Sequence, residues 1–203
     1  MRFVVSKLPS RILLASFSLA VSFVYLLDRH PEISAEEAQQ GTLLDHPNWL
    51  GPYVPTPPEV IDAMLKLATV REGDILYDLG SGDGRIIIRA AEKHSINTVG
   101  IEFDEELCRA TRVSVRERHL EARVRVIQGD ILEQDLSEAS VVTVYLLPKS
   151  LGKIAALLQT QLKKGARVVV VNDEMPGWKF NKRLNVRENS NGRDWRVFLY
   201  VIQ

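Results

Sequence analysis

The sequence predicts an α/β fold: a doubly wound, seven-strand Rossmann-like sheet that ends in an antiparallel hairpin and is preceded by an N-terminal hydrophobic helix. Three observations lead to this prediction. A glycine-rich loop at 80–84 stands between an apolar strand and a helical pattern, short apolar strands then alternate with helical stretches, and the last two strands follow each other directly. Alternating strands and helices build a parallel sheet, whereas two consecutive strands joined by a short polar turn pair antiparallel.

Length and charge set limits on the function. The chain of 203 residues is long enough for one domain and an appendage, and its hydrophobic content of 45% suffices for a globular core. Lysine plus arginine and aspartate plus glutamate number 26 each, so the net charge of zero gives no general electrostatic reason to bind nucleic acid. A single cysteine, Cys108, and four scattered histidines lead us to predict no disulfide framework and no metal site.

The N-terminus contains an uncharged apolar run of 16 residues, 12–27, between charged residues. As a helix it would span about 24 Å at ~1.5 Å per residue, slightly less than a hydrocarbon core of ~30 Å. A signal peptide, a transit peptide and an uncleaved anchor each fit part of this pattern. We favour residues 1–27 as an anchor that can double as a targeting segment. The alternative, a helix of the globular core, is disfavoured because the run has no polar face.

Residues 28–48 are polar and aperiodic, so we expect a linker there and a folded domain over 49–203. The domain's first helix is predicted to begin with a capping box, Thr56 followed three residues later by Glu59, with Pro57 at the first helical position. The proline-rich segment before this helix has a second interpretation, a lid beside a ligand loop.

The strongest motif is the loop after the first strand, where Gly80, Gly82 and Gly84 follow Asp78 and enclose Asp83. A strand, a tight glycine turn and a helix N-terminus let the backbone close around a small ligand, because a Cβ would block positive φ and close approach. Such a loop by itself also fits dinucleotide binders. The two carboxylates repel a pyrophosphate but suit a ligand with an ammonium and a sulfonium, and S-adenosylmethionine is such a ligand.

Two further acids stand at strand ends. Glu102 closes the second strand, 22 residues after Gly80 (102 − 80), where an acid in a doubly wound sheet accepts hydrogen bonds from ribose hydroxyls. The alternative for Glu102 is a cap on the following helix. Asp130 follows the third strand and can accept a bond from an adenine amino group, with Ile131 packed on the ring. Asp130 can also cap a short helix, and the two roles are compatible.

The fourth strand, 140–148, is a nearly continuous apolar run, as expected of a central parallel strand, and the next helix is predicted over 151–162. Its carboxyl end lies beside the first strand's loop, so we predict that Tyr145 lines the mouth of the site. The fifth strand, 167–171, is followed by strands 183–188 and 195–202 around a polar asparagine-glycine turn. A dehydrogenase sheet would instead continue with parallel strands.

Together these motifs resemble the class I (seven-strand) S-adenosylmethionine-dependent methyltransferases. The resemblance is greatest to the small single-domain group that includes the mitochondrial lysine methyltransferases acting on the ATP synthase c subunit and the adenine nucleotide translocase, with their bacterial relatives. It covers roughly residues 50–180, and the hydrophobic N-terminus also matches, because the mitochondrial members carry an uncleaved one. The matching stretches are Pro52–Thr56, Asp78–Arg85, Val99–Glu102, Gln128–Asp130, Tyr145–Pro148 and Gly165–Val169.

The resemblance implies that Asp78, Gly80, Gly82, Glu102 and Asp130 bind S-adenosylmethionine, which is the predicted cofactor. The sequence departs from the wider family after the fifth strand, at Asn172-Asp173-Glu174, which leaves the substrate side open, and at the end of the fourth strand. The fourth strand ends in Tyr-Leu-Leu-Pro rather than in Asn/Asp-Pro-Pro-Tyr/Phe, so positioning of an amino group by such an asparagine is not carried over.

The predicted activity is that of a protein-lysine N-methyltransferase acting on a membrane or mitochondrial protein. Such an enzyme holds a nucleophile in line with the methyl group, and a lysine must first lose a proton. Asp173 or Glu174, after the fifth strand, are candidates to orient the ammonium or relay its proton, with Tyr145 at the mouth. The alternatives are a small-molecule or lipid acceptor, a catalytically silent cofactor-binding module, and an NAD-linked oxidoreductase, the last disfavoured by the loop acids and the terminal hairpin.

Residues 12–27 predict association with a membrane, the mitochondrial inner membrane if the source is a eukaryote and a bacterial membrane otherwise. The predicted partner is a protein substrate, and nucleic acid is not among the predicted partners. The positive-inside rule would place residues 1–11 in the cytoplasm and the domain across the membrane, whereas the domain needs a compartment that holds its cofactor. The sequence leaves this topology open.

Overall fold

The structure, a computed structural model, describes residues 49–203. The predicted anchor at 1–27 and the predicted linker at 28–48 lie outside the described residues. Within 49–203, no helix is long and apolar enough to cross a membrane.

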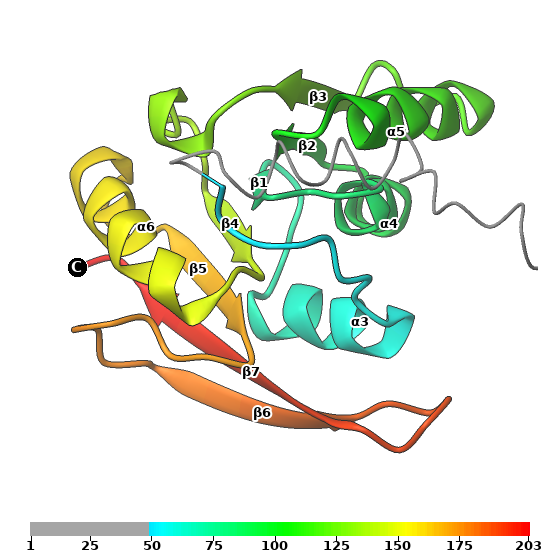
Figure 1. The fold of residues 1–203 in the computed structure, drawn as a ribbon. Helices are drawn as coiled ribbons and strands as arrows, with labels where there is room; N and C mark the ends of the chain where they lie inside the picture. The colour runs from blue at the N-terminus through cyan, green and yellow to red at the C-terminus, as the bar shows by residue number, and fades with distance from the viewer. Residues whose placement is uncertain (1–48) are drawn as a thin grey trace, which may run out of the picture. The chain divides into compact units, whose positions relative to one another are not determined.

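The described part of the chain forms one seven-stranded sheet in the order β3-β2-β1-β4-β5-β7-β6 (Figure 1). The first five strands are parallel, and β7 pairs antiparallel with both β5 and β6. This order confirms the predicted doubly wound sheet with a closing hairpin. The strands are β1 Ile75–Leu79, β2 Asn97–Glu102, β3 Val124–Gln128, β4 Val141–Val144, β5 Arg167–Val171, β6 Lys182–Arg187 and β7 Asp194–Val201.

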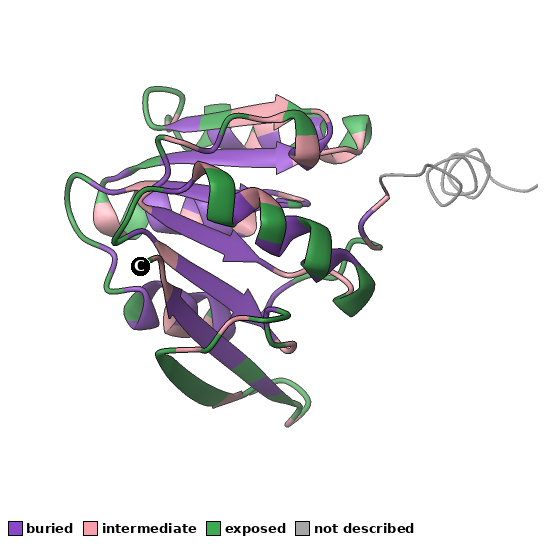
Figure 2. Cartoon of the chain, turned by 90° about the vertical axis from the view of Figure 1, so that its left-hand side faces the viewer, coloured by how far each residue is buried: buried purple, intermediate pink, exposed green. Residues whose placement is uncertain are grey.

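Helices cover both faces of the sheet, and alternate residues along each strand supply the two cores (Figure 2). Leu76 and Val141 pack on the side of α3 and α4, whereas Tyr77 and Val142 pack on the side of α6. Burial on both faces explains why the central strands read as continuous apolar runs. The helices are α3 Pro58–Leu67, α4 Arg85–His94, α5 Glu105–Glu117, the 3-10 turn η1 Ile131–Glu133, and α6 Pro148–Gln161.

The predicted capping box of the first helix is wrong. Helix α3 begins at Pro58, and its N-cap is Pro57, whose side chain cannot accept a hydrogen bond. Thr56 is instead buried, and its carbonyl oxygen accepts a hydrogen bond from Arg85 Nη1 at 3.1 Å. Glu59 accepts a bond from the backbone N–H of Asn189, in the β6–β7 turn, at 2.5 Å. Thr56 and Glu59 thus each form a contact with a distant part of the chain instead of the predicted capping box.

The boundaries around the fourth strand also differ from prediction. Strand β4 ends at Val144, and α6 begins at Pro148, earlier than the sequence pattern indicated. The reason is that Pro148 stands in the first turn of α6, where its missing N–H costs nothing. Residues 145–147 therefore form an irregular segment at the carboxyl edge of the sheet, beside the loop that follows β1.

Candidate active site

The glycine loop after β1 turns the chain sharply and lays it against β2. The backbone N–H groups of Gly80 and Ser81 both donate to the carbonyl of Ile101, at 2.9 and 3.0 Å. Gly82 has φ +55°, and a Cβ at this position would lie 2.6 Å from the ring of Tyr53. Side chains at this turn would therefore strain the backbone and displace the segment that covers it. The loop needs glycine for the close approach that the sequence predicted.

Asp78, at the end of β1, holds a buried carboxylate with one unused oxygen. Its Oδ1 accepts a hydrogen bond from the Thr143 hydroxyl at 2.6 Å, and among the described residues Oδ2 has no partner. Burial, helped by the negative charges of Glu102 and Asp83, raises the pKa of the Asp78 carboxyl to about 7 against the lowering effect of the Thr143 bond. The unsatisfied oxygen marks a place for a cationic group.

Asp83, the second acid of the loop, is already paired. Arg85 donates from Nε to Oδ1 at 2.9 Å and from Nη2 to Oδ2 at 2.7 Å. The same guanidinium reaches the Thr56 carbonyl and the Tyr53 hydroxyl, each at 3.1 Å. Burial opposes ionisation of Asp83, but the bonds from Arg85 lower its pKa overall. Of the two loop acids, Asp78 is the one left to balance a cation, whereas Asp83 ties the loop to the segment before α3.

The side chain of Glu102, at the end of β2, contacts the backbone of the glycine loop. Its Oε2 accepts from the Gly82 N–H at 2.7 Å, and its Oε1 accepts from the N–H groups of Phe103 and Asp104 at 2.8 and 2.9 Å. The helix that follows is capped by Asp104, which accepts from Glu106 and Leu107. The capping alternative for Glu102 is therefore wrong. The backbone instead fixes this carboxylate beside Gly82, where the ribose-binding prediction puts it.

Asp130 and Ile131 lie in the next loop along the same edge. The Gly129 N–H donates to the Glu102 carbonyl at 2.9 Å, which places this loop beside β2. Asp130 Oδ1 accepts from the Leu132 N–H at 2.8 Å and caps η1, as predicted. Ile131 is 6% exposed and packs in the core on the α6 side. Binding of adenine by this pair stays a prediction.

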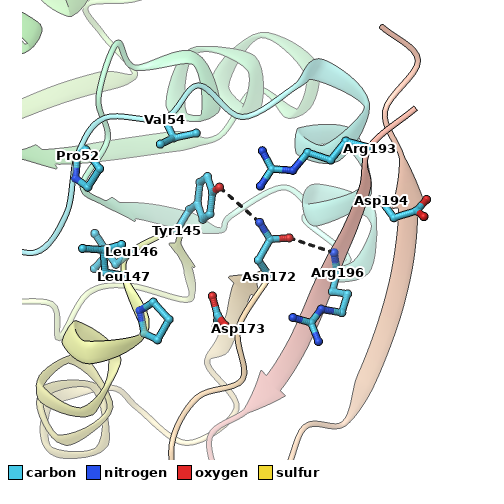
Figure 3. Close-up of a pocket in the computed structure, with 11 residues that line it drawn as sticks. Pro52, Val54, Tyr145, Leu146, Leu147, Asn172, Asp173, Arg193, Asp194 and Arg196 are labelled. Carbon is cyan, nitrogen blue, oxygen red and sulfur yellow. Dashed lines mark hydrogen bonds between the residues drawn. The ribbon is translucent and has the colours of Figure 1, made fainter. Parts of the chain in front are cut away.

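An open groove of about 410 Å³ lies beyond the carboxyl ends of β4 and β5 (Figure 3). One wall is apolar and comes from the segment before α3 and from residues 145–148. The other wall is polar and comes from the end of β5 and from the hairpin. The lining residues are Pro52, Val54, Tyr145, Leu146, Leu147, Pro148, Asn172, Asp173, Arg193, Asp194 and Arg196.

Tyr145 stands inside this groove and is held from two sides. Its ring packs edge-on against Trp195 with centroids 5.6 Å apart, and its hydroxyl accepts from Asn172 Nδ2 at 3.4 Å. Asn172 is itself fixed to β7: its N–H donates to the Arg196 carbonyl at 2.7 Å, and its Oδ1 accepts from the Arg196 N–H at 3.3 Å (Figure 3). The sequence analysis gave Asn172 no role. Its φ of +66° and its contacts across the sheet are visible only in the fold.

The structure separates the two acids that follow β5. Asp173 lines the groove together with Tyr145, and no hydrogen bond or ion pair within residues 49–203 engages its carboxylate. Glu174 is exposed and does not line the groove. Burial raises the pKa of Tyr200, the bond from Met175 partly offsets this rise, and the negative charge of Glu174 adds to it. Of the two candidates, Asp173 has the geometry to meet a substrate.

Comparison with known proteins agrees with this geometry. The ANTKMT methyltransferase domain family matches residues 78–182. Over 152 residues the chain is 39% identical to a protein-lysine N-methyltransferase of Saccharolobus islandicus, covering 74% of this chain and 93% of that relative. The chain belongs to the ANTKMT methyltransferase domain family. A Xenopus laevis lysine N-methyltransferase named for the ATP synthase c subunit is 32% identical over 63% of this methyltransferase, which spans 55% of that relative's length.

Solved structures show the same fold. A crystal structure titled as an RNA methyltransferase from Salinibacter ruber in complex with S-adenosyl-L-homocysteine is 44% identical to this methyltransferase, with a TM-score of 0.67. The match covers 73% of this chain and 94% of that one. TrmN from Thermus thermophilus, at 19% identity and a TM-score of 0.60, shares the fold.

The cofactor of this methyltransferase is S-adenosylmethionine, and the residues present fit it. The unsatisfied Asp78 oxygen suits the ammonium of the methionine part. The Gly82 N–H holds the Glu102 carboxylate beside the loop, and its binding to the ribose hydroxyls stays a prediction. The cofactor supplies an already activated methyl group on a sulfonium. The chain's own task is to bind this group beside the groove and to hold the acceptor there.

Proposed function

We propose that this chain is an S-adenosylmethionine-dependent protein-lysine N-methyltransferase whose acceptor lysine enters the groove beside Tyr145. The observation that carries the proposal is the Asp173 carboxylate, which lines the groove without a partner among the described residues. Relatives in Saccharolobus islandicus and Xenopus laevis that are named as lysine methyltransferases support it. So does the mouse adenine nucleotide translocase lysine N-methyltransferase, at 31% identity over 128 residues.

The two walls of the groove suit the two parts of a lysine side chain. The proline and leucine side chains of the apolar wall can pack along the methylene stem, while Asp173 accepts a hydrogen bond from the ammonium. The acceptor nitrogen must be neutral when it attacks, so Asp173 can also take up or relay its proton. Tyr145, fixed by Asn172 and Trp195, limits how the amine turns toward the cofactor side.

RNA is the rival acceptor, because the Salinibacter ruber structure is titled as an RNA methyltransferase. The groove argues against it. Its two aspartates stand against two arginines, so the lining has no excess of positive charge to hold a phosphate backbone. Tyr145 is the single aromatic side chain among the lining residues, whereas single-stranded RNA is held by a series of aromatic side chains on which successive bases stack. The net charge of zero adds no general attraction for a polyanion.

The test uses the purified full-length protein with radiolabelled S-adenosylmethionine. Protein extract and total RNA from the same cells are offered separately, and the products are resolved by mass. We expect label in lysine residues of protein. Label in RNA, or in a small molecule or lipid of the extract, would overturn the proposal. The Asp173→Asn variant should lose most turnover while keeping its affinity for S-adenosylhomocysteine, since the groove and not the cofactor site is changed.

We also propose that residues 12–27 attach the protein to a membrane, in mitochondria if the source is a eukaryote, and that its substrate is a protein of that membrane. The support is the uncharged apolar run of 16 residues. The full-length protein should stay with membranes on carbonate extraction. A Val21→Asp/Phe23→Asp variant should be released, because a charge in the middle of a spanning helix costs about 3 kcal/mol. Release of the unchanged protein would contradict the proposal.

A further inference from the structure

Two arginines of the hairpin line the groove on the side opposite the apolar wall. Arg193 lies in the β6–β7 turn and Arg196 on β7, and both are exposed. Figure 3 shows the guanidinium of Arg193 turned toward Tyr145 and that of Arg196 across from Asp173. The two arginines of the hairpin and the carboxylate of Asp173, after β5, thus line the same groove.

Arg193 is held in place by an aromatic support. Its guanidinium carbon lies 4.3 Å from the ring centroid of Trp195, which is 2% exposed. Trp195 is fixed in turn, because its Nε1 donates to Glu188 Oε2 at 2.9 Å. Stacking on a fixed ring orients the guanidinium and leaves its N–H groups available for an anion.

Neither guanidinium is committed to an acid. Within residues 49–203, no side-chain hydrogen bond or ion pair involves the guanidinium of Arg193 or Arg196. Most other arginines near carboxylates are paired, as Arg187 is with Asp194 at 3.5 Å. Asp194 also lines the groove, but this pairing offsets its charge. The groove therefore offers the carboxylate of Asp173 and two guanidiniums that no acid binds by a hydrogen bond, although Glu188 also attracts Arg193 electrostatically.

We propose that the groove selects a lysine that has an acidic side chain close to it in the substrate, with Asp173 receiving the ammonium and Arg193 and Arg196 receiving the carboxylate. This inference rests on the proposed lysine methyltransferase function and adds the class of sequence that it accepts. A carboxylate matches the guanidinium fork, because its two oxygens can accept two parallel N–H bonds. The hairpin arginines are specificity residues that do not touch the cofactor loop.

The test compares three peptides that differ only in the residues flanking one lysine, which are glutamate, glutamine or lysine. Full-length enzyme should methylate the glutamate peptide with a kcat/KM about tenfold above that of the glutamine peptide, and the lysine-flanked peptide should be poorest. An Arg193→Glu/Arg196→Glu variant should reverse this order. Arg193→Gln/Arg196→Gln, which keeps the polar character, should remove the preference.

Lys164→Glu is the matched control, because Lys164 is exposed in the turn before β5, at the opposite end of that strand from the groove. It reverses one surface charge and should leave the peptide preference unchanged. Affinity for S-adenosylhomocysteine should be the same in all these variants. Equal rates for the glutamate and glutamine peptides would overturn the inference, as would a preference for a phosphoserine neighbour over glutamate. Failure to methylate any lysine peptide or protein would instead overturn the proposed function.

Discussion

At the scale of single residues, Asp78 carries a structural cost that a bound cation would remove. Its carboxylate is buried, and Thr143 satisfies only one of its oxygens. Because the pKa in the folded state, about 7, lies above the ordinary aspartate value of 3.8, the folded protein binds more protons than the unfolded chain between these values. The contribution of Asp78 to the free energy of unfolding therefore falls as pH rises through this window. A bound ammonium removes that cost.

Asp78→Asn should weaken binding of S-adenosylhomocysteine at least about tenfold at pH 8, because a charge-assisted bond to the ammonium is lost. The unchanged protein should itself bind about tenfold more weakly at pH 6 than at pH 8, since most Asp78 is protonated there. The variant should lack this dependence. Calorimetry at both pH values measures how the affinity for S-adenosylhomocysteine changes with pH in each protein. The same change in both would refute the binding of the ammonium by Asp78.

Gly82→Ala should lower the free energy of unfolding by about 1 kcal/mol and weaken S-adenosylhomocysteine binding. The added Cβ would meet the Tyr53 ring at 2.6 Å, and the residue has φ +55°. The control is Gly152→Ala in α6, where the described residues leave the Cβ position clear within 4 Å. It should gain about 0.5–1 kcal/mol from helix propensity and bind the ligand normally. Urea unfolding and calorimetry check both variants.

At the scale of elements, a largely buried charge network joins the starts of three strands, β1, β4 and β5, to the end of helix α3. Arg167, first in β5, pairs with Asp74, and its Nη1 donates to the carbonyls of Ala68 and Thr69 at 2.9 Å each. Ser140 donates to the same carboxylate at 2.8 Å. Burial opposes ionisation, yet bonds from the Arg71 N–H, Ser140 and Arg167 lower the pKa of Asp74 overall. This network lies at the sheet edge away from the site.

Arg167→Ala should lower the free energy of unfolding by about 3 kcal/mol, because it leaves the buried carboxylate of Asp74 without its cation. Arg116→Ala, at an exposed position on α5, should change it by less than about 0.5 kcal/mol. Urea midpoints at pH 7 give both values. Methyl transfer by the folded fraction should be unaffected, and a loss below about 1 kcal/mol would show that the network carries little stability.

At the scale of the whole molecule, the site is built from loops that the chain order separates. Residues near 53, 80, 102, 130, 145, 172 and 193 meet along the carboxyl edges of the parallel strands and the neighbouring hairpin turn. A ligand that bridges several of these loops binds the folded state alone and therefore stabilises the whole sheet.

S-adenosylhomocysteine at 100 times its Kd should raise the free energy of unfolding by about 2.7 kcal/mol, which corresponds to an increase in Tm of roughly 5–10 °C. NAD at the same concentration should give no increase, because the loop acids repel its pyrophosphate. Thermal unfolding with each ligand tests this. Equal stabilisation by both would contradict the cofactor assignment.

Much of the fold and of the cofactor site follows from the sequence because the relevant signals are local. Apolar runs bounded by turns predicted the strands, and the strand–glycine–helix pattern at 78–85 predicted the loop. Glu102 and Asp130 could be picked out because each stands at a strand end, and parallel strands end on a common edge.

Only the tertiary structure decided which of the candidate acids are available to a ligand or a substrate. Asp83 and Asp78 look alike in sequence, but Arg85 pairs with the first and leaves the second to a ligand. Asp173 and Glu174 are neighbours, yet only Asp173 lines the groove. Arg85 is close to Asp83 in the chain, but the Thr56 and Tyr53 oxygens that hold its guanidinium are about 30 residues away. The hairpin residues that form the groove with Asp173 are likewise distant in the sequence, and turn propensities and periodicity do not encode such contacts. The sequence by itself determined the sheet and the cofactor loop, whereas the meeting of the β5 end, the hairpin turn and the segment before α3 determined the groove for the acceptor.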